Sequence, residues 1–149
     1  MTQYIYIASP VKLPQGCFGH TPISAETPNV FNSEFDYTHL YFENNYDSII
    51  KRKFTYSPHF TYNYQVAAAA NDIPLKSCIK GTREEEKCLE LLYSYITEAM
   101  KASGTLQYFT CVSGKEDSER LIQRKVNWND LQEPYDLVLD DREYWEITF

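Results

Sequence analysis

Residues 82–103 carry the strongest structural signal in this chain, because apolar side chains recur there at steps of three and four residues. The recurring positions are Cys88, Leu89, Leu92, Ile96, Ala99 and Met100. This spacing predicts one long helix with a single buried stripe. At 1.5 Å per residue the helix is about 33 Å long, enough to cross a whole sheet. The rest of the chain must therefore supply an apolar surface of matching length.

Both ends of this helix are specified by the local sequence. Thr82 is followed three residues later by Glu85, which matches a capping box. Residues 84–86 are three consecutive glutamates, and they lie where the positive end of the helix dipole is expected. Lys101 in the last turn and Gly104 directly after it predict where the helix ends.

Short segments of strand-prone sequence surround the helix. They cover residues 3–8, 37–43, 51–57, 60–66, 105–112, 120–128, 135–139 and 143–149. Residues 67–70 fit either a continuation of a strand or a helical turn. The last two segments are expected to pair as a hairpin, with Trp145, Ile147 and Phe149 on a shared face. The predicted class is α+β: a mainly antiparallel sheet of about six to seven strands packed against the helix in one domain of 149 residues.

Residues 9–34 show no periodic pattern and contain four prolines and two glycines. A connection of this length is unusual in a compact domain, and it is typically either functional or mobile. We expect a long Pro/Gly-containing loop near the N-terminus.

Acidic residues are concentrated at the C-terminal end of the chain. Residues 130–149 hold seven acidic side chains and one arginine, so they account for −6 of the net charge of −7. Such a field disfavours nucleic acid and anionic lipid, and it favours a basic partner or a cation. The chain has no apolar run of the ~20 residues that a membrane span requires and no signal-peptide pattern at its start. A cytoplasmic protein with no nucleic-acid or membrane partner is expected.

The cysteines are Cys17, Cys78, Cys88 and Cys111, and they show no C-x-x-C pair. An even count is compatible with two disulfides. Without a signal peptide, however, buried free thiols are the expected state.

Catalytic and metal-binding motifs are sparse. Cys17 and His20 have a C-x-x-H spacing that zinc could use, but no second ligand pair accompanies them. We therefore expect no metal site and no cofactor. Cys17 could form a thiolate pair with His20 or His39 only if the fold brought them together. The chain has neither G-x-S-x-G nor a glycine-rich phosphate loop, so an enzyme is less expected than a binding protein.

This profile favours a small acidic binding protein that inhibits or regulates a macromolecule. Bacterial immunity proteins and phage counter-defence proteins share these bulk properties, which is an analogy of composition. The expected contact residues, on the C-terminal hairpin, are Asp136, Asp140, Asp141, Glu143, Tyr144, Trp145 and Glu146. They would meet a protein partner with a basic surface, combining electrostatic steering with aromatic anchors.

The alternative is a small-molecule or nucleotide-binding domain, because the chain holds 13 tyrosines. Tyrosine rings can line a pocket and stack on a ligand. In this interpretation the pocket lies under residues 10–32. Its expected ligand-binding residues are Lys12, His20, Tyr41, Tyr62 and Tyr64.

Overall fold

The computed structural model describes residues 2–44 and 57–149. In chain order its elements are β1 (Gln3–Ser9), β2 (Gly16–Phe18), α1 (Glu34–Tyr37), β3 (Leu40–Asn44), β4 (Tyr64–Ala69), the 3₁₀ helix η1 (Lys76–Cys78), α2 (Arg83–Ser103), β5 (Thr105–Val112), β6 (Ile122–Asn127), the 3₁₀ helices η2 (Trp128–Asp130) and η3 (Pro134–Leu137), and β7 (Glu143–Thr148).

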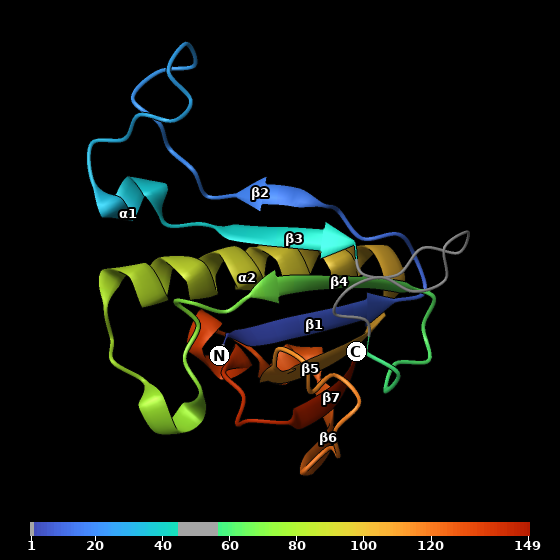
Figure 1. Cartoon of the computed structure of the whole chain (residues 1–149). Coiled ribbons are helices and arrows are strands. Elements are labelled where there is room, and N and C mark those ends of the chain that lie inside the picture. Colours follow the sequence, from blue (N-terminus) through green and yellow to red (C-terminus); the bar gives the residue numbers. More distant parts are fainter. Residues whose placement is uncertain (1, 45–56) are drawn as a thin grey trace.

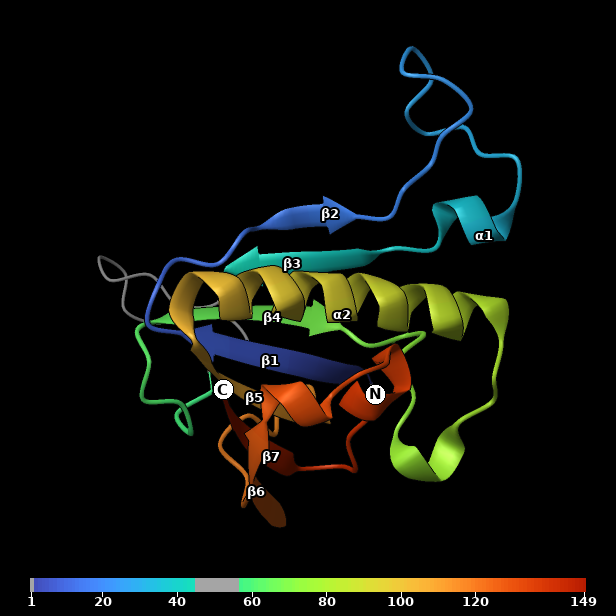
Figure 2. The same ribbon diagram turned by 180° about the vertical axis from the view of Figure 1, so that it is seen from behind.

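Within the described ranges, seven strands form one sheet in the order β2-β3-β4-β1-β5-β7-β6. Neighbouring strands are antiparallel except β6 and β7, which are parallel. The long helix α2 lies across one face of this sheet (Figure 1; Figure 2). The predicted α+β class is therefore confirmed. No described helix combines the length and the apolar character that crossing a bilayer demands.

The ends of α2 are those that the sequence predicted. The Thr82 hydroxyl accepts a hydrogen bond from the Glu85 backbone N–H at 3.1 Å. Gly104 ends the helix with a left-handed φ of 73° and donates its N–H to the carbonyl of Met100. Glu85 is itself buried, and its carboxylate accepts from the backbone N–H of Gly81 at 2.9 Å. The segment before the helix is thereby tied to its first turn.

The connection β4–α2–β5 explains why the helix is so long. Both β4 and β5 pair antiparallel with β1, which lies between them, so they run parallel to each other. Parallel strands need a crossover connection, and α2 supplies it. The helix packs on the face that carries Ile5, Ile7 and Leu106, whereas Tyr6 and Phe109 belong to a smaller cluster on the opposite face. The helix therefore leaves one face of the sheet to other segments.

Two strands start three or four residues later than predicted. The strand predicted at residues 37–43 starts only at Leu40, because residues 34–37 form α1 behind the N-cap Ser33. The strand predicted at 60–66 starts at Tyr64, and residues 67–69 prolong it. The strand predicted at 51–57 lies outside the described residues except for its last position.

The delayed start of β4 has a local cause. The backbone N–H groups of Thr61 and Tyr62 donate to the side-chain oxygen of Gln107, at 3.0 and 3.3 Å. Phe60 is buried in the smaller cluster, where its ring lies 6.0 Å from that of Tyr144. This segment therefore satisfies its backbone through a side chain instead of a strand ladder.

The predicted C-terminal hairpin is wrong. Its first half is η3, where Glu133 and Asp136 form a reciprocal capping box. Its second half is β7, which lies in the sheet between β5 and β6. The predicted apolar face of β7 holds for Trp145 and Ile147, which are buried, but Phe149 is 60% exposed.

The region predicted as a long loop contains β2, which pairs with β3 at one edge of the sheet. Residues 19–33 project beyond that edge (Figure 1). The sequence-based expectation of free thiols holds for all four cysteines. Their expected burial holds for Cys88 and Cys111, whereas Cys17 and Cys78 are exposed.

Replacing Thr82 by alanine tests the cap of α2. The variant Thr82→Ala removes the acceptor for the Glu85 N–H, so we expect it to lower the free energy of unfolding by about 1 kcal/mol. This corresponds to a fall in Tm of about 2–4 °C for a chain of this size, measurable by circular dichroism. Ser94→Ala, at an exposed position within α2, is the matched control and should change stability by only a few tenths of a kcal/mol. Equal losses in the two variants would contradict the capping role.

Candidate functional site

A pocket of about 440 Å³ lies at one end of the sheet. The start of β1, the start of β3, the end of β4 and the N-terminus of α2 meet at this end (Figure 1). Its volume falls within the range of small-molecule sites, roughly 300–1,000 Å³. Tyr4 and Ala67 line it, and both belong to the cluster on the face opposite α2. The pocket therefore opens on the face that the long helix leaves uncovered.

Small side chains create this depression. In the strand register, Tyr4 faces Ala69 and Glu43 faces Ala67. Large side chains of β1 and β3 thus stand on either side of a row of alanines on β4. Side chains on neighbouring strands are only about 5 Å apart, so the alanine row leaves a trough between tyrosine walls, with Tyr41 lining it from β3.

The pocket is strongly acidic. The carboxylates that line it are those of Glu34, Glu43, Asp72 and Glu84, and the tyrosines are Tyr4, Tyr37 and Tyr41. No lysine or arginine is among the described residues that line it. Burial, followed by the charge of Glu84, raises the pKa of Asp72, while nearby His39 acts in the opposite direction. Negative charges are thus close enough to act on one another, and such a field concentrates cations.

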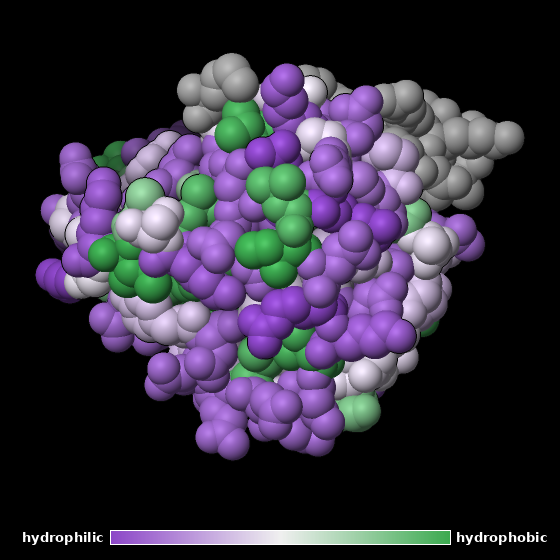
Figure 3. Space-filling view, turned by 90° about the horizontal axis from the view of Figure 1, so that it is seen from below, coloured by the Kyte–Doolittle hydropathy of each residue, from purple (hydrophilic) through white to green (hydrophobic). Residues whose placement is uncertain are grey.

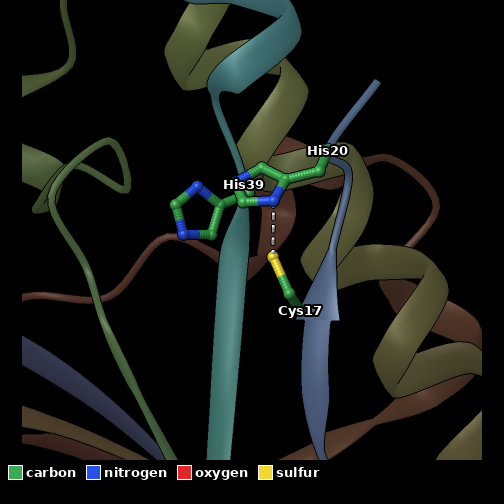
Figure 4. A group of neighbouring side chains, drawn as sticks. All are labelled: Cys17, His20 and His39. Carbon is green, nitrogen blue, oxygen red and sulfur yellow. Dashed lines mark hydrogen bonds between the residues drawn. The ribbon is translucent and has the colours of Figure 1, made fainter. Parts of the chain in front are cut away.

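His39, which lines the pocket, also belongs to a second group of side chains with Cys17 and His20 (Figure 4). Cys17 on β2 pairs with Tyr41 on β3, and His39 is two residues before Tyr41, so the three share one face. His20 follows β2 after Gly19, whose φ of 104° turns the chain. The Cys17 sulfur lies 3.3 Å from Nδ1 of His20. One ligand atom from each of Cys17, His20 and His39 lies within 4.8 Å of the others.

Aromatic rings hold the two imidazoles. The His20 ring lies 5.3 Å from Phe31, 5.2 Å from Tyr37 and 4.0 Å from His39, measured between ring centroids. Nδ1 of His39 lies 2.9 Å from the Tyr37 carbonyl oxygen. A carbonyl can only accept, so this nitrogen carries the proton and Nε2 keeps its lone pair in the neutral ring.

The protonation of this group does not suit a cysteine nucleophile. Burial raises the pKa of the Cys17 thiol. Burial first, and then the charges of His39 and Lys87, lower the pKa of His20. A neutral thiol beside a neutral imidazole is a hydrogen-bonding pair, whereas a nucleophilic cysteine needs its thiolate form.

The residues predicted on the acidic C-terminal segment do not form one surface. Glu143, Tyr144 and Trp145 are buried, with 0%, 3% and 2% of their surface exposed. The Glu143 carboxylate lies 3.2 Å from the Lys76 ammonium group. It also accepts from the backbone N–H of Asp140 at 2.9 Å. These contacts are structural, because they neutralise and bind a buried charge.

The other four residues of that prediction are partly exposed: Asp136, Asp140, Asp141 and Glu146. Asp136 belongs to η3 on the helix side of the sheet, since neighbouring Tyr135 donates its hydroxyl to Glu85 of α2. Glu146 shares a face with Tyr144, which is on the opposite side. These acids are therefore divided between the two faces.

Two of the five residues predicted for a small ligand lie at this site. Tyr41 lines the pocket and His20 belongs to the neighbouring cluster. Tyr64 is at the other end of β4, about 17 Å along the strand from Ala69. The Tyr62 hydroxyl bonds to that of Thr105 at 2.9 Å. Lys12 lines a shallow depression elsewhere, together with Leu13, Pro14 and Gln15.

Sequence reasoning missed most of the pocket. Asp72, Glu84, Tyr4 and Tyr37 come from separate elements, and the glutamates at the helix start were attributed to the dipole alone. One local signal was available. Residues 67–70 are four alanines in a strand context, and a row of small residues indicates a trough on a sheet.

Comparison of this chain with protein-family models, with curated proteins and with solved structures finds no significant match. The chemistry of the site must therefore be interpreted from its own residues and distances.

Replacing Gly19 by alanine tests how this site is built. An added Cβ would lie 2.5 Å from Cδ1 of Leu91 and 3.3 Å from the Thr38 carbonyl oxygen, in a backbone conformation that L-residues avoid. The matched control is Gly16→Ala, with φ of 117° and no atom within 4 Å of its Cβ. We expect the control to lose about 1–2 kcal/mol of unfolding free energy from backbone strain. Gly19→Ala should lose at least ~1 kcal/mol more from overpacking. Equal losses in chemical denaturation would show that close packing at Gly19 is unimportant.

Proposed function

We propose that this protein binds a basic macromolecular partner, as an inhibitor or regulator, and that a lysine or arginine side chain of the partner enters the acidic pocket. The observation that carries this proposal is the lining of the pocket. Four carboxylates and three tyrosines surround it, and no lysine or arginine is among its described lining residues.

This lining suits a long cationic side chain. A guanidinium or ammonium head can meet the carboxylates of Asp72 and Glu84, while its apolar stem lies on a tyrosine ring. Tyr41 is 55% exposed, so its ring is available for a cation–π contact, whereas the Tyr37 ring is already stacked on His20. Arginine fits best, because its planar fork pairs with carboxylates and also stacks on rings.

Charge elsewhere on the molecule supports the same kind of partner. The net charge of −7 attracts a basic surface over long range and raises the rate of encounter. The acidic residues of the C-terminal segment contribute to this field, although they do not share the pocket. A nucleotide, the alternative predicted from the tyrosines, is disfavoured because its phosphates would meet four carboxylates.

The described surface at the β6 edge offers no broad apolar alternative to the acidic pocket. It is mostly hydrophilic, with apolar residues in small, separate groups (Figure 3). A broad apolar interface is the mark of many obligate assemblies, and the described residues at this edge present none. Bacterial immunity proteins and phage counter-defence proteins share the bulk properties of this chain, and we propose this class by analogy of composition.

The proposal is testable with a short arginine-containing peptide and NMR. We expect titration of the ¹⁵N-labelled protein to shift the signals of Tyr4, Tyr41 and Asp72. The double variant Asp72→Asn, Glu84→Gln should bind about 10-fold more weakly, since each exposed ion pair contributes up to about 1 kcal/mol. The matching glutamate peptide should cause no shifts.

The double variant Asp140→Asn, Asp141→Asn is the control, because it changes the net charge by the same amount outside the pocket. It should weaken binding by less than about 3-fold. Equal weakening in both double variants would show that only net charge matters. A larger effect in the control would return the binding site to the acidic C-terminal segment. Partners captured from the native host should be lost in the pocket variant and kept in the control.

A further inference from the structure

The Cys17–His20–His39 cluster has the donor atoms of a transition-metal site. It offers one sulfur and two imidazole nitrogens from β2, the turn after it and the residue just before β3 (Figure 4). Sulfur and imidazole are the ligands that zinc favours, whereas magnesium and calcium take oxygen. In the sequence alone, no further metal ligands accompany Cys17 and His20. The pairing of β2 with β3 supplies the third ligand.

The spacing of these atoms is close to what such an ion requires. A tetrahedral zinc with Zn–N of about 2.0–2.1 Å and Zn–S of about 2.3 Å holds its ligand atoms roughly 3.3–3.6 Å apart. The Cys17 sulfur and Nδ1 of His20 are already 3.3 Å apart. All three ligand atoms lie within 4.8 Å of one another. Metal binding therefore requires these atoms to draw together by at most about 1.5 Å.

The surroundings prepare the ligands for binding. The Tyr37 carbonyl accepts a hydrogen bond from Nδ1–H of His39, so Nε2 keeps the lone pair that can bind a metal ion. Metal-binding histidines usually have such a second contact, which fixes their tautomer and orientation. The rings of Phe31 and Tyr37 pack against His20 and restrict its orientation.

We propose that Cys17, His20 and His39 bind one divalent transition-metal ion, with zinc the best fit, and leave its fourth position to water. Three protein ligands with one open position are the arrangement of reactive zinc sites, in contrast to the four-ligand sites of structural zinc. This inference goes beyond the proposed function and does not depend on it.

Binding exchanges a proton for the metal. The S–H bond of Cys17 breaks, the sulfur electron pair forms the bond to the ion, and the proton passes to solvent. His20 and His39 would each bind through the lone pair of a ring nitrogen. Because one proton leaves per ion, the apparent affinity must fall as the pH is lowered.

Cobalt(II) titration of the reduced, metal-free protein tests this site. We expect one ion to bind per chain, with the intense visible bands of a four-coordinate cobalt and a near-ultraviolet thiolate-to-cobalt charge-transfer band. Zinc should displace the cobalt. Cys17→Ser should abolish the charge-transfer band and weaken zinc binding by more than the 10–100-fold that loss of a second-shell contact costs.

Cys78→Ser removes the other exposed thiol and is the matched control, which should keep the band and the affinity.

His39→Gln provides an independent test should Cys17→Ser fold poorly, and it should weaken zinc binding while the folded state persists in circular dichroism. Zinc should raise the Tm of the wild type and of Cys78→Ser, but not that of Cys17→Ser. Absence of the band in the wild type, or its survival in Cys17→Ser, would overturn the assignment. Loss of zinc affinity in Cys78→Ser equal to that in Cys17→Ser would do the same.

Discussion

The packing of α2 against β1, β4 and β5 is the interaction on which the rest of the structure depends. Leu89, Leu92 and Ile96 are fully buried in one cluster with the inward residues of the sheet. The helix also connects β4 to β5, with β1 between them, so it is the crossover that lets these two strands run parallel. It covers only one face. The residues of the other face are free to form a pocket, and the N-terminus of the helix brings Glu84 to its rim.

The helix could be predicted because its signals are local and agree with one another. Thr82 marks the start of the helix and Gly104 marks its end, and the apolar stripe lies between these two positions. Strand periodicity is local too, so β7 was found with the correct apolar face at Trp145 and Ile147. Its partners are not local. β5 precedes β7 by more than 30 residues and β6 runs parallel to it, so a hairpin was the nearest but incorrect choice.

The candidate site could not be predicted for the same reason. His39 is 19 residues from His20, and only the register of β2 against β3 brings its face beside Cys17. A C-x-x-H pair alone gives half of a metal site, and local sequence does not reveal which distant strand completes it. In the pocket, Glu84 and Glu34 each have a local explanation, because they lie in the first turns of α2 and α1. These carboxylates come together only because separate segments of the chain meet at this end of the sheet.

His39 connects the two proposals, because it belongs to the metal cluster and also lines the acidic pocket. A divalent ion bound through one thiolate adds a net charge of +1 beside the carboxylates. That charge stabilises their ionised forms, and at Asp72 it opposes the burial and the Glu84 charge that raise the pKa of this carboxyl group. The same charge repels the cationic side chain of a partner. Metal and partner therefore oppose each other electrostatically, and linkage requires that each weaken the affinity for the other by the same factor.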